Sequence, residues 1–149
     1  MPDASDTTAA TTPTAEDAGW DVITAGVQRA QSLLGTRLIA AYALGSLAQG
    51  GFAPEVSDVD LALIVGSMRT DPEPICRAIR ERVAATLSVP LASRLSLFCS
   101  SWSDLETSTP RGRFPLVDRI DLVDAGVCLY GEDQRARVAL PTEIGRAHV

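Results

Sequence analysis

Two short apolar stretches constrain the fold of this 149-residue chain more than any other feature of its sequence. The first, LIAAYAL, covers Leu38–Leu44, and the second, DVDLALIV, covers residues 58–65. Each is too short for a typical helix, which favours buried strands. A small loop with Gly50, Gly51 and Pro54 joins them, so we expect the two strands to be neighbours.

Hydrophobic periodicity predicts two helices and two further strands. The helices cover residues 16–34 and 70–87, and the strands cover 91–99 and 127–130. Gly35 suits the C-cap of the first helix, and Thr70 or Asp71 followed by Pro72 suits the start of the second. The segment 116–122 carries a weaker signal. Two hairpin-like connections favour an α+β fold, with a mixed sheet packed on helices, over a doubly wound parallel sheet.

Both ends of the chain are expected to lie outside the folded domain, which we place at 16–143. Residues 1–15 are rich in Thr, Ala and Asp without periodicity, which predicts a disordered acidic tail. The last residues, IGRAHV (144–149), match the conceptual translation of a common sequencing-library adapter. We therefore expect them to be artefactual and the native C-terminus to be missing; an ordinary solvated tail is the alternative.

The residue types present narrow the available chemistry. All 13 basic residues are arginines, and the only histidine is His148. A P-loop lysine, Schiff-base chemistry and a histidine general base are therefore excluded from the domain. The absence of Lys and Asn beside abundant Ala, Arg and Gly is typical of GC-rich bacterial coding. Carboxylates, arginines, hydroxyls and bound metal remain for catalysis.

Charge, hydropathy and cysteine spacing exclude several other classes. The net charge is −6 and no basic stripe is visible, so nonspecific nucleic-acid binding is not expected. No apolar run approaches the roughly 20 residues of a membrane span, and the first residues lack the features of a secretory signal. Cys76, Cys99 and Cys128 fit no zinc spacing and are expected to be reduced. The cytoplasm is the expected location.

The chemistry is concentrated in residues 41–65. Asp58 and Asp60 are two residues apart on a strand, so both side chains project from the same face, about 6–7 Å apart. Such carboxylates repel unless a cation lies between them, and Mg²⁺ prefers one or two carboxylates plus substrate phosphates. Gly45 and Ser46 follow the neighbouring strand, where backbone N–H groups can hold phosphate oxygens. Each half alone is a weak signal, but together they predict one site.

The sequence Leu44-Gly45-Ser46, followed after eleven residues by Asp58-Val59-Asp60-Leu61, resembles the signature of the nucleotidyltransferase superfamily that includes DNA polymerase beta. It looks most like the aminoglycoside adenylyltransferases and their small bacterial relatives, sharply over 38–65 and diffusely to about 133. The resemblance implies a palm-like α+β fold and transfer of a nucleoside monophosphate, expected from ATP, to an acceptor hydroxyl. Gly45 and Ser46 would hold the triphosphate, and Asp58 and Asp60 would bind Mg²⁺.

One departure from the family concerns a third carboxylate, which usually comes from a later strand. The inward position of the strand 91–99 is Ser96, which cannot act as a base near neutral pH. Asp118 and Asp121 would substitute if their segment folds back; the alternative is surface charge with Arg119 as a local partner. Without a third carboxylate the site is slow, completed by missing residues, or degenerate.

Several other residues have a functional interpretation beside a structural one. Arg111 and Arg113 flank Gly112 and suit a clamp on phosphate or an acidic acceptor, although a solvated loop is favoured. Ser57 either assists a ligand or holds the loop before Asp58. Core packing is favoured for the larger side chains and thiols, namely Trp102, Cys99 and Cys128.

Three functions remain open for such a domain. The acceptor is a small hydroxylated molecule such as an aminoglycoside, or a protein hydroxyl, as in minimal nucleotidyltransferases that act as antitoxins by modifying a toxin. The third is a nucleotide-binding relative without turnover.

Overall fold

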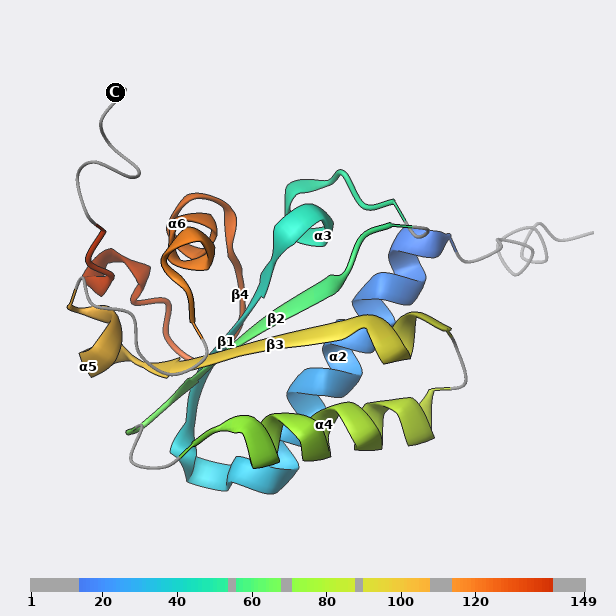
Figure 1. Ribbon diagram of the computed structural model, residues 1–149, viewed down its shortest axis with the longest axis horizontal. Coiled ribbons are helices and arrows are strands. Elements are labelled where there is room, and N and C mark those ends of the chain that lie inside the picture. The colour runs from blue at the N-terminus through green and yellow to red at the C-terminus, as the bar shows by residue number, and fades with distance from the viewer. Residues whose placement is uncertain (1–13, 54–55, 68–70, 88–89, 108–113, 141–149) are drawn as a thin grey trace, which may run out of the picture.

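A computed structural model describes residues 14–53, 56–67, 71–87, 90–107 and 114–140 of the chain. A four-stranded mixed sheet carries helices on both of its faces (Figure 1). The strands are β1 (Leu38–Leu44), β2 (Val59–Val65), β3 (Leu95–Ser101) and β4 (Val127–Tyr130), in the order β3-β2-β1-β4. β1 is antiparallel to β2 and β4, whereas β2 and β3 are parallel. The predicted α+β fold is confirmed.

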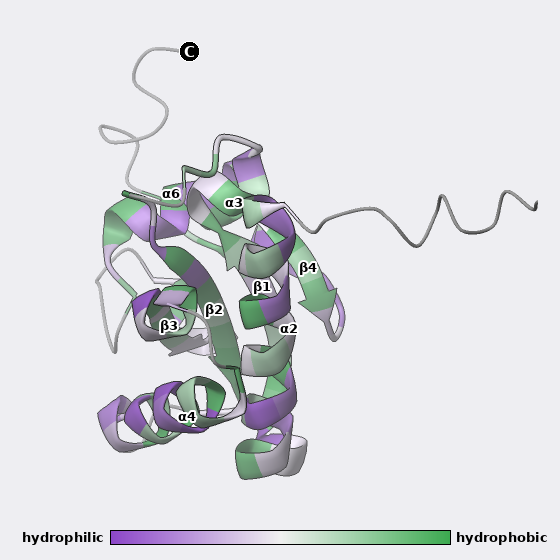
Figure 2. Ribbon diagram, turned by 90° about the vertical axis from the view of Figure 1, so that its right-hand side faces the viewer, coloured by the Kyte–Doolittle hydropathy of each residue, from purple (hydrophilic) through white to green (hydrophobic). Residues whose placement is uncertain are grey.

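Two long helices, α2 (Ala15–Leu34) and α4 (Glu73–Thr86), cover one face of the sheet. α2 begins with a capping box, because Thr14 and Asp17 exchange side-chain and backbone hydrogen bonds, and it ends at Gly35 with φ 57°. Apolar residues of β1, β2 and β3 meet the two helices in one continuous cluster; Figure 2 shows the strands as mostly hydrophobic. This aliphatic face excludes water from one side of the sheet.

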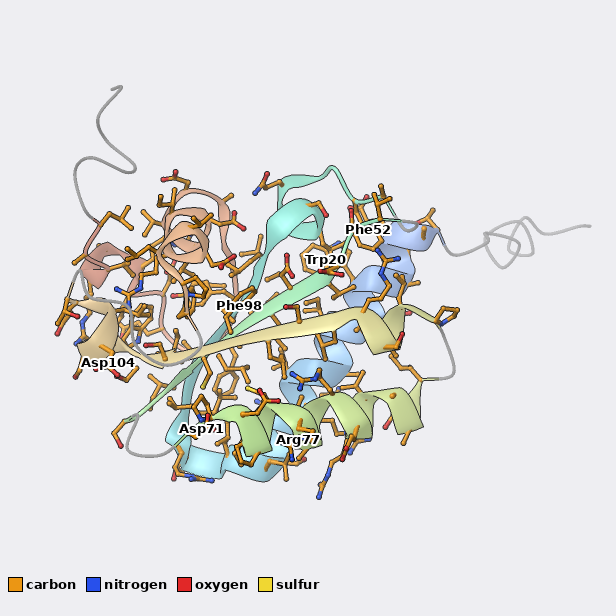
Figure 3. The ribbon with its side chains drawn as sticks, in the orientation of Figure 1. Trp20, Phe52, Asp71, Arg77, Phe98 and Asp104 are labelled. Atoms are coloured by element: carbon orange, nitrogen blue, oxygen red, sulfur yellow. The ribbon has the colours of Figure 1, made fainter. Side chains whose placement is uncertain are left out.

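The opposite face is covered by α5 (Trp102–Leu105), α6 (Leu116–Ala125) and the chain after β4. The short helix α3 (Gly45–Gln49) follows β1, and its Leu47 packs in the first cluster. Its cluster includes aromatic residues: Phe98 of β3 (Figure 3) packs against Phe114, with ring centroids 5.7 Å apart. Beyond Asp60 this face of β2 is apolar, since Ala62 and Ile64 are fully buried on this side. This face of the sheet is therefore buried by a second hydrophobic core, which the sequence did not predict.

Several boundaries differ from the predicted ones. The strand predicted from residue 91 begins at Leu95, because Pro90–Arg94 forms a 3-10 helix and a proline lacks the N–H that a strand ladder uses. α4 begins only at Glu73, with Pro72 as its N-cap. Residues 116–122 belong to the ten-residue helix α6. Asp58 lies just before β2.

Arg119, which the sequence suggests as a local partner for surface charge at Asp118 and Asp121, does not lie at the surface. Its side chain is fully buried and donates hydrogen bonds to the carbonyl oxygens of Phe114 and Thr107. Cys76 and Cys99 are buried, as is Trp102, which packs edge-on against Tyr42. Cys128 is only half-buried.

Other expectations fall outside the described part of the chain. These are most of the acidic tail, the adapter-like residues 144–149, and the loop with Arg111 and Arg113. Among the described residues, no helix is both long and apolar enough to cross a bilayer.

Candidate functional site

The two halves of the motif meet where β1 ends and β2 begins. Leu44 and Asp60 are paired in the antiparallel register, so Gly45 emerges directly beside Asp60. Gly45 has φ 69°, and a Cβ at this position would collide with the carboxylate of Asp60. The conformation and the close approach both require glycine here. The structure thus joins the Gly-Ser turn and the aspartate pair in one site.

Asp58 and Asp60 differ in their exposure. The Asp58 side chain is 65% exposed, whereas Asp60 is half-buried. Burial is the largest cause that raises the pKa of Asp60 from 3.8 to about 6, followed by the negative charges of Asp58, Asp118 and Asp121. Ionised Asp60 therefore carries an electrostatic cost that a bound cation would remove.

α6 supplies the two more distant carboxylates. Both oxygens of Asp121 accept hydrogen bonds of 2.8 Å, one from the backbone N–H of Gly45 and one from the side-chain amide of Gln49. Burial, and then the charge of Asp121, raise the pKa of Asp118. The structure brings this helix against the Gly-Ser turn, and four carboxylates gather at this end of the sheet.

The three serines of the sequence hypothesis occupy different positions. Ser46 is the second residue of α3, after Gly45. The hydroxyl of Ser57 accepts a hydrogen bond from the Ala53 N–H, and the Ser57 N–H donates to the Ala53 carbonyl, so this residue holds the loop before Asp58. Ser96 pairs in register with Asp60 across the parallel strands, so a neutral hydroxyl stands beside the aspartate.

Arg94 is a site residue that sequence reasoning missed. Its Nε lies 4.0 Å from Oδ1 of Asp58, and its side chain is 27% exposed. Arg94 ends the 3-10 helix Pro90–Arg94 directly before β3, so the alternation of a strand does not predict where its side chain lies. Gln49 was missed as well, since only the docking of α6 reveals its role.

A cavity of about 500 Å³ opens beside the site, lined by Gln49 of α3 and by residues of α6 that include Asp118 and Asp121. Within the described residues, no group of three or more His, Cys, Asp or Glu side chains is arranged to hold a metal ion. The hard oxygens of Asp58 and Asp60 and the raised pKa of Asp60 do fit a divalent cation such as Mg²⁺, with its remaining ligands taken from phosphate or water.

Aromatic residues border this end of the molecule. Trp20 of α2 and Phe52, which follows α3, are half-buried against the aliphatic core (Figure 3). A Cβ added to Gly19 would lie 3.1 Å from the side chain of Leu47 and 3.5 Å from the ring of Phe52, so α3 and the loop after it both pack against α2 at this glycine. These contacts anchor the loop that leads to Asp58.

The chain matches no family model and no curated protein sequence. Among solved structures it is similar to a toxin–antitoxin with AMP-PNP, at 20% identity and a TM-score of 0.45 over 75% of each chain. It is also similar to a tyrosine-to-alanine mutant of the toxin–antitoxin MntA–HpeT, at 20% identity and a TM-score of 0.48 over 74% of this chain and 72% of that one. A mutant of the same toxin–antitoxin, with two aspartates replaced by glutamates, is similar at 19% identity and a TM-score of 0.45, over 72% of this chain and 73% of that one. These similarities are distant, so the function has to follow from the residues of the site.

Proposed function

We propose that this chain is a polymerase-beta-like nucleotidyltransferase domain, which moves a nucleoside monophosphate from ATP to an acceptor hydroxyl and releases pyrophosphate. The observation that carries the proposal is the placement of Gly45 against Asp60 at the paired ends of β1 and β2. This contact converts two weak sequence signals into one site of the kind that the resemblance implies.

Each residue of the motif has a proposed role. The backbone of Gly45 and Ser46 holds the triphosphate, and the carboxylates of Asp58 and Asp60 hold Mg²⁺. When bound, the metal ions stabilise the entering and leaving oxygens of an in-line displacement. Ser57 keeps Asp58 in position through its bonds to Ala53.

A third carboxylate is proposed from α6 rather than from β3, because Ser96 occupies the β3 position beside Asp60. Asp118 is the better candidate of the two in α6, since both oxygens of Asp121 are engaged by Gly45 and Gln49. Arg111 and Arg113 remain proposed contacts for phosphate or an acidic acceptor.

The acceptor class is tested directly by transfer. ATP labelled at its α-phosphate is incubated with Mg²⁺ and either aminoglycosides or a protein extract, and labelled products and pyrophosphate are measured. We expect label on a small hydroxylated molecule first and on a protein hydroxyl second, lost in Asp58→Ala. Nucleotide binding without label on any acceptor would favour the relative without turnover, and no binding would reject the proposal.

A further inference from the structure

One contact in the site is not explained by the roles proposed above. The N–H of Gly45, which we assign to the triphosphate, already donates a 2.8 Å hydrogen bond to Oδ2 of Asp121. The other oxygen of Asp121 accepts from Nε2 of Gln49, also at 2.8 Å. The two residues bonded to Asp121 are 72 and 76 positions away in the chain, so the contact depends on the docking of α6 against α3.

A carboxylate in this place resembles the ligand it would exclude. Like a phosphate, it is an anion that presents several acceptor oxygens to backbone and amide donors. Its position among Asp58, Asp60 and Asp118 is electrostatically unfavourable, so the hydrogen bonds from Gly45 and Gln49 have to hold it there. A triphosphate with Mg²⁺ would offer the same donors a more highly charged acceptor.

We propose that Asp121 sets the nucleotide affinity of this site by occupying the Gly45 N–H in the empty protein. The inference rests on the proposed function, because it needs Gly45 to be a phosphate donor. A phosphate oxygen replaces the Asp121 carboxylate when nucleotide binds, and the Asp121 side chain leaves the Gly45 N–H while Asp118 of α6 stays at the site. The docked state then competes with nucleotide, and the apparent Kd is the intrinsic Kd divided by the fraction of molecules in which Asp121 is undocked.

Two other roles for Asp121 make different predictions. If the residue only caps the turn at Gly45, its removal destabilises the fold and leaves nucleotide affinity unchanged or lower. If it is a ligand for metal or substrate, its removal weakens or abolishes binding. Competition predicts tighter binding when the carboxylate is removed, and a larger gain than the loss of a nearby negative charge gives by itself.

The test measures the Kd of ATP with Mg²⁺ by titration calorimetry for the wild type, Asp121→Ala and Asp124→Ala. Asp124 is exposed one turn further along the same helix and borders the same cavity, so its substitution makes the same change in net charge close to the site. We expect Asp121→Ala to tighten binding about tenfold, because a hydrogen bond to a charged group is no longer broken on binding. Asp124→Ala should change the Kd less than about twofold, as screened charges do.

A second variant and a second probe keep the result decisive. Asp121→Asn preserves the shape of the side chain but loses the charge, so it should also tighten nucleotide binding. It replaces Asp121→Ala as the test if that variant does not fold. Inorganic tripolyphosphate with Mg²⁺, which lacks base and sugar, should gain as much as ATP. Unchanged or weaker binding in the Asp121 variants, or an equal gain in Asp124→Ala, overturns the inference while the proposed function stands. Absence of binding in every protein, wild type included, overturns both.

Discussion

The two faces of the sheet are covered by different kinds of side chain. The face under α2 and α4 is an aliphatic cluster to which β2 contributes Val59, Leu61 and Leu63. The face under α5 and α6 contains aromatic rings, the fully buried Arg119 and the half-buried Asp60. The first face only has to exclude water, whereas the second has to hold polar groups in fixed positions. The candidate site lies on the second face.

The second face is closed by charged residues of the chain after β4. The Tyr42 hydroxyl donates a 2.8 Å hydrogen bond to Oδ1 of Asp133 and accepts the N–H of Gln134. Arg135 lies 5.5 Å from the centre of the Tyr42 ring, and its hydrogen bonds lower the pKa of Asp133 to about 2. On this face, hydrogen bonds and a cation–π contact add to the apolar packing that closes the sheet.

The largest expected effect tests the aliphatic face. Leu63 and Ile64 are adjacent, fully buried and directed to opposite faces of β2. Each substitution to alanine should lower the free energy of unfolding by about 2–5 kcal/mol, measured by urea denaturation. Leu63→Ala should leave the nucleotide affinity of the folded protein unchanged. Ile64→Ala changes the face that carries the candidate site, so a change in affinity is compatible with the separation of the faces. A loss of affinity confined to Leu63→Ala would contradict the separation of the faces.

A smaller effect is expected at the turn of the site. Gly45→Ala should cost about 2–4 kcal/mol, because the residue has positive φ and its Cβ would collide with Asp60. Gly50→Ala is the matched control, since Gly50 has a left-handed conformation (φ 89°, ψ 5°) but its Cβ would meet nothing within 4 Å. We expect about 1 kcal/mol there. Equal losses in the free energy of unfolding for the two variants, measured by thermal or urea unfolding, would show that the contact with Asp60 does not matter at Gly45.

The faces also differ in how far the sequence predicts them. Period-2 alternation in β2 and helical spacing in α2 identify the aliphatic face, because each pattern is local. The contact of Asp121 with Gly45 and the burial of Arg119 depend on how α6 docks, and no local pattern records it. The site itself was predictable in part, since the Gly-Ser turn and the aspartate pair each mark a strand end.

The third effect concerns the electrostatic cost stored at Asp60. The folded protein holds this proton more tightly than the unfolded chain, since its pKa is about 6 rather than 3.8. The wild type therefore loses stability as the pH rises from about 4 through 6. Asp60→Asn should be more stable than the wild type by about 1–2 kcal/mol at pH 7–8, with no difference below pH 4.

The matched control for this pH profile is Asp124→Asn, on the exposed side of α6. Its stability relative to the wild type should vary little between pH 4 and 8. Urea midpoints across this range give the comparison for both variants. An Asp60→Asn protein that is less stable than the wild type at pH 8 would refute the prediction that ionised Asp60 destabilises the folded protein.

The smallest effect tests the closure of the second face. Tyr42→Phe removes the hydroxyl that joins Asp133 and Gln134 and should cost about 1 kcal/mol in urea denaturation. Nucleotide affinity should not change, because the hydroxyl contacts the chain after β4. If the variant were as stable as the wild type, the hydrogen bonds of Tyr42 would not contribute to closing this face.

Asp58 and Asp60, with the Gly45 turn, are proposed to form a metal-dependent nucleotide site. This proposal is tested most directly by melting the wild type and Asp58→Ala with increasing ATP, with and without Mg²⁺. Ligand in hundredfold excess over its Kd should stabilise the wild type by about 2.7 kcal/mol, only when Mg²⁺ is present. The Asp58→Ala protein should melt normally without ligand and show no such gain. An equal gain in both proteins, or one independent of Mg²⁺, would contradict the claim.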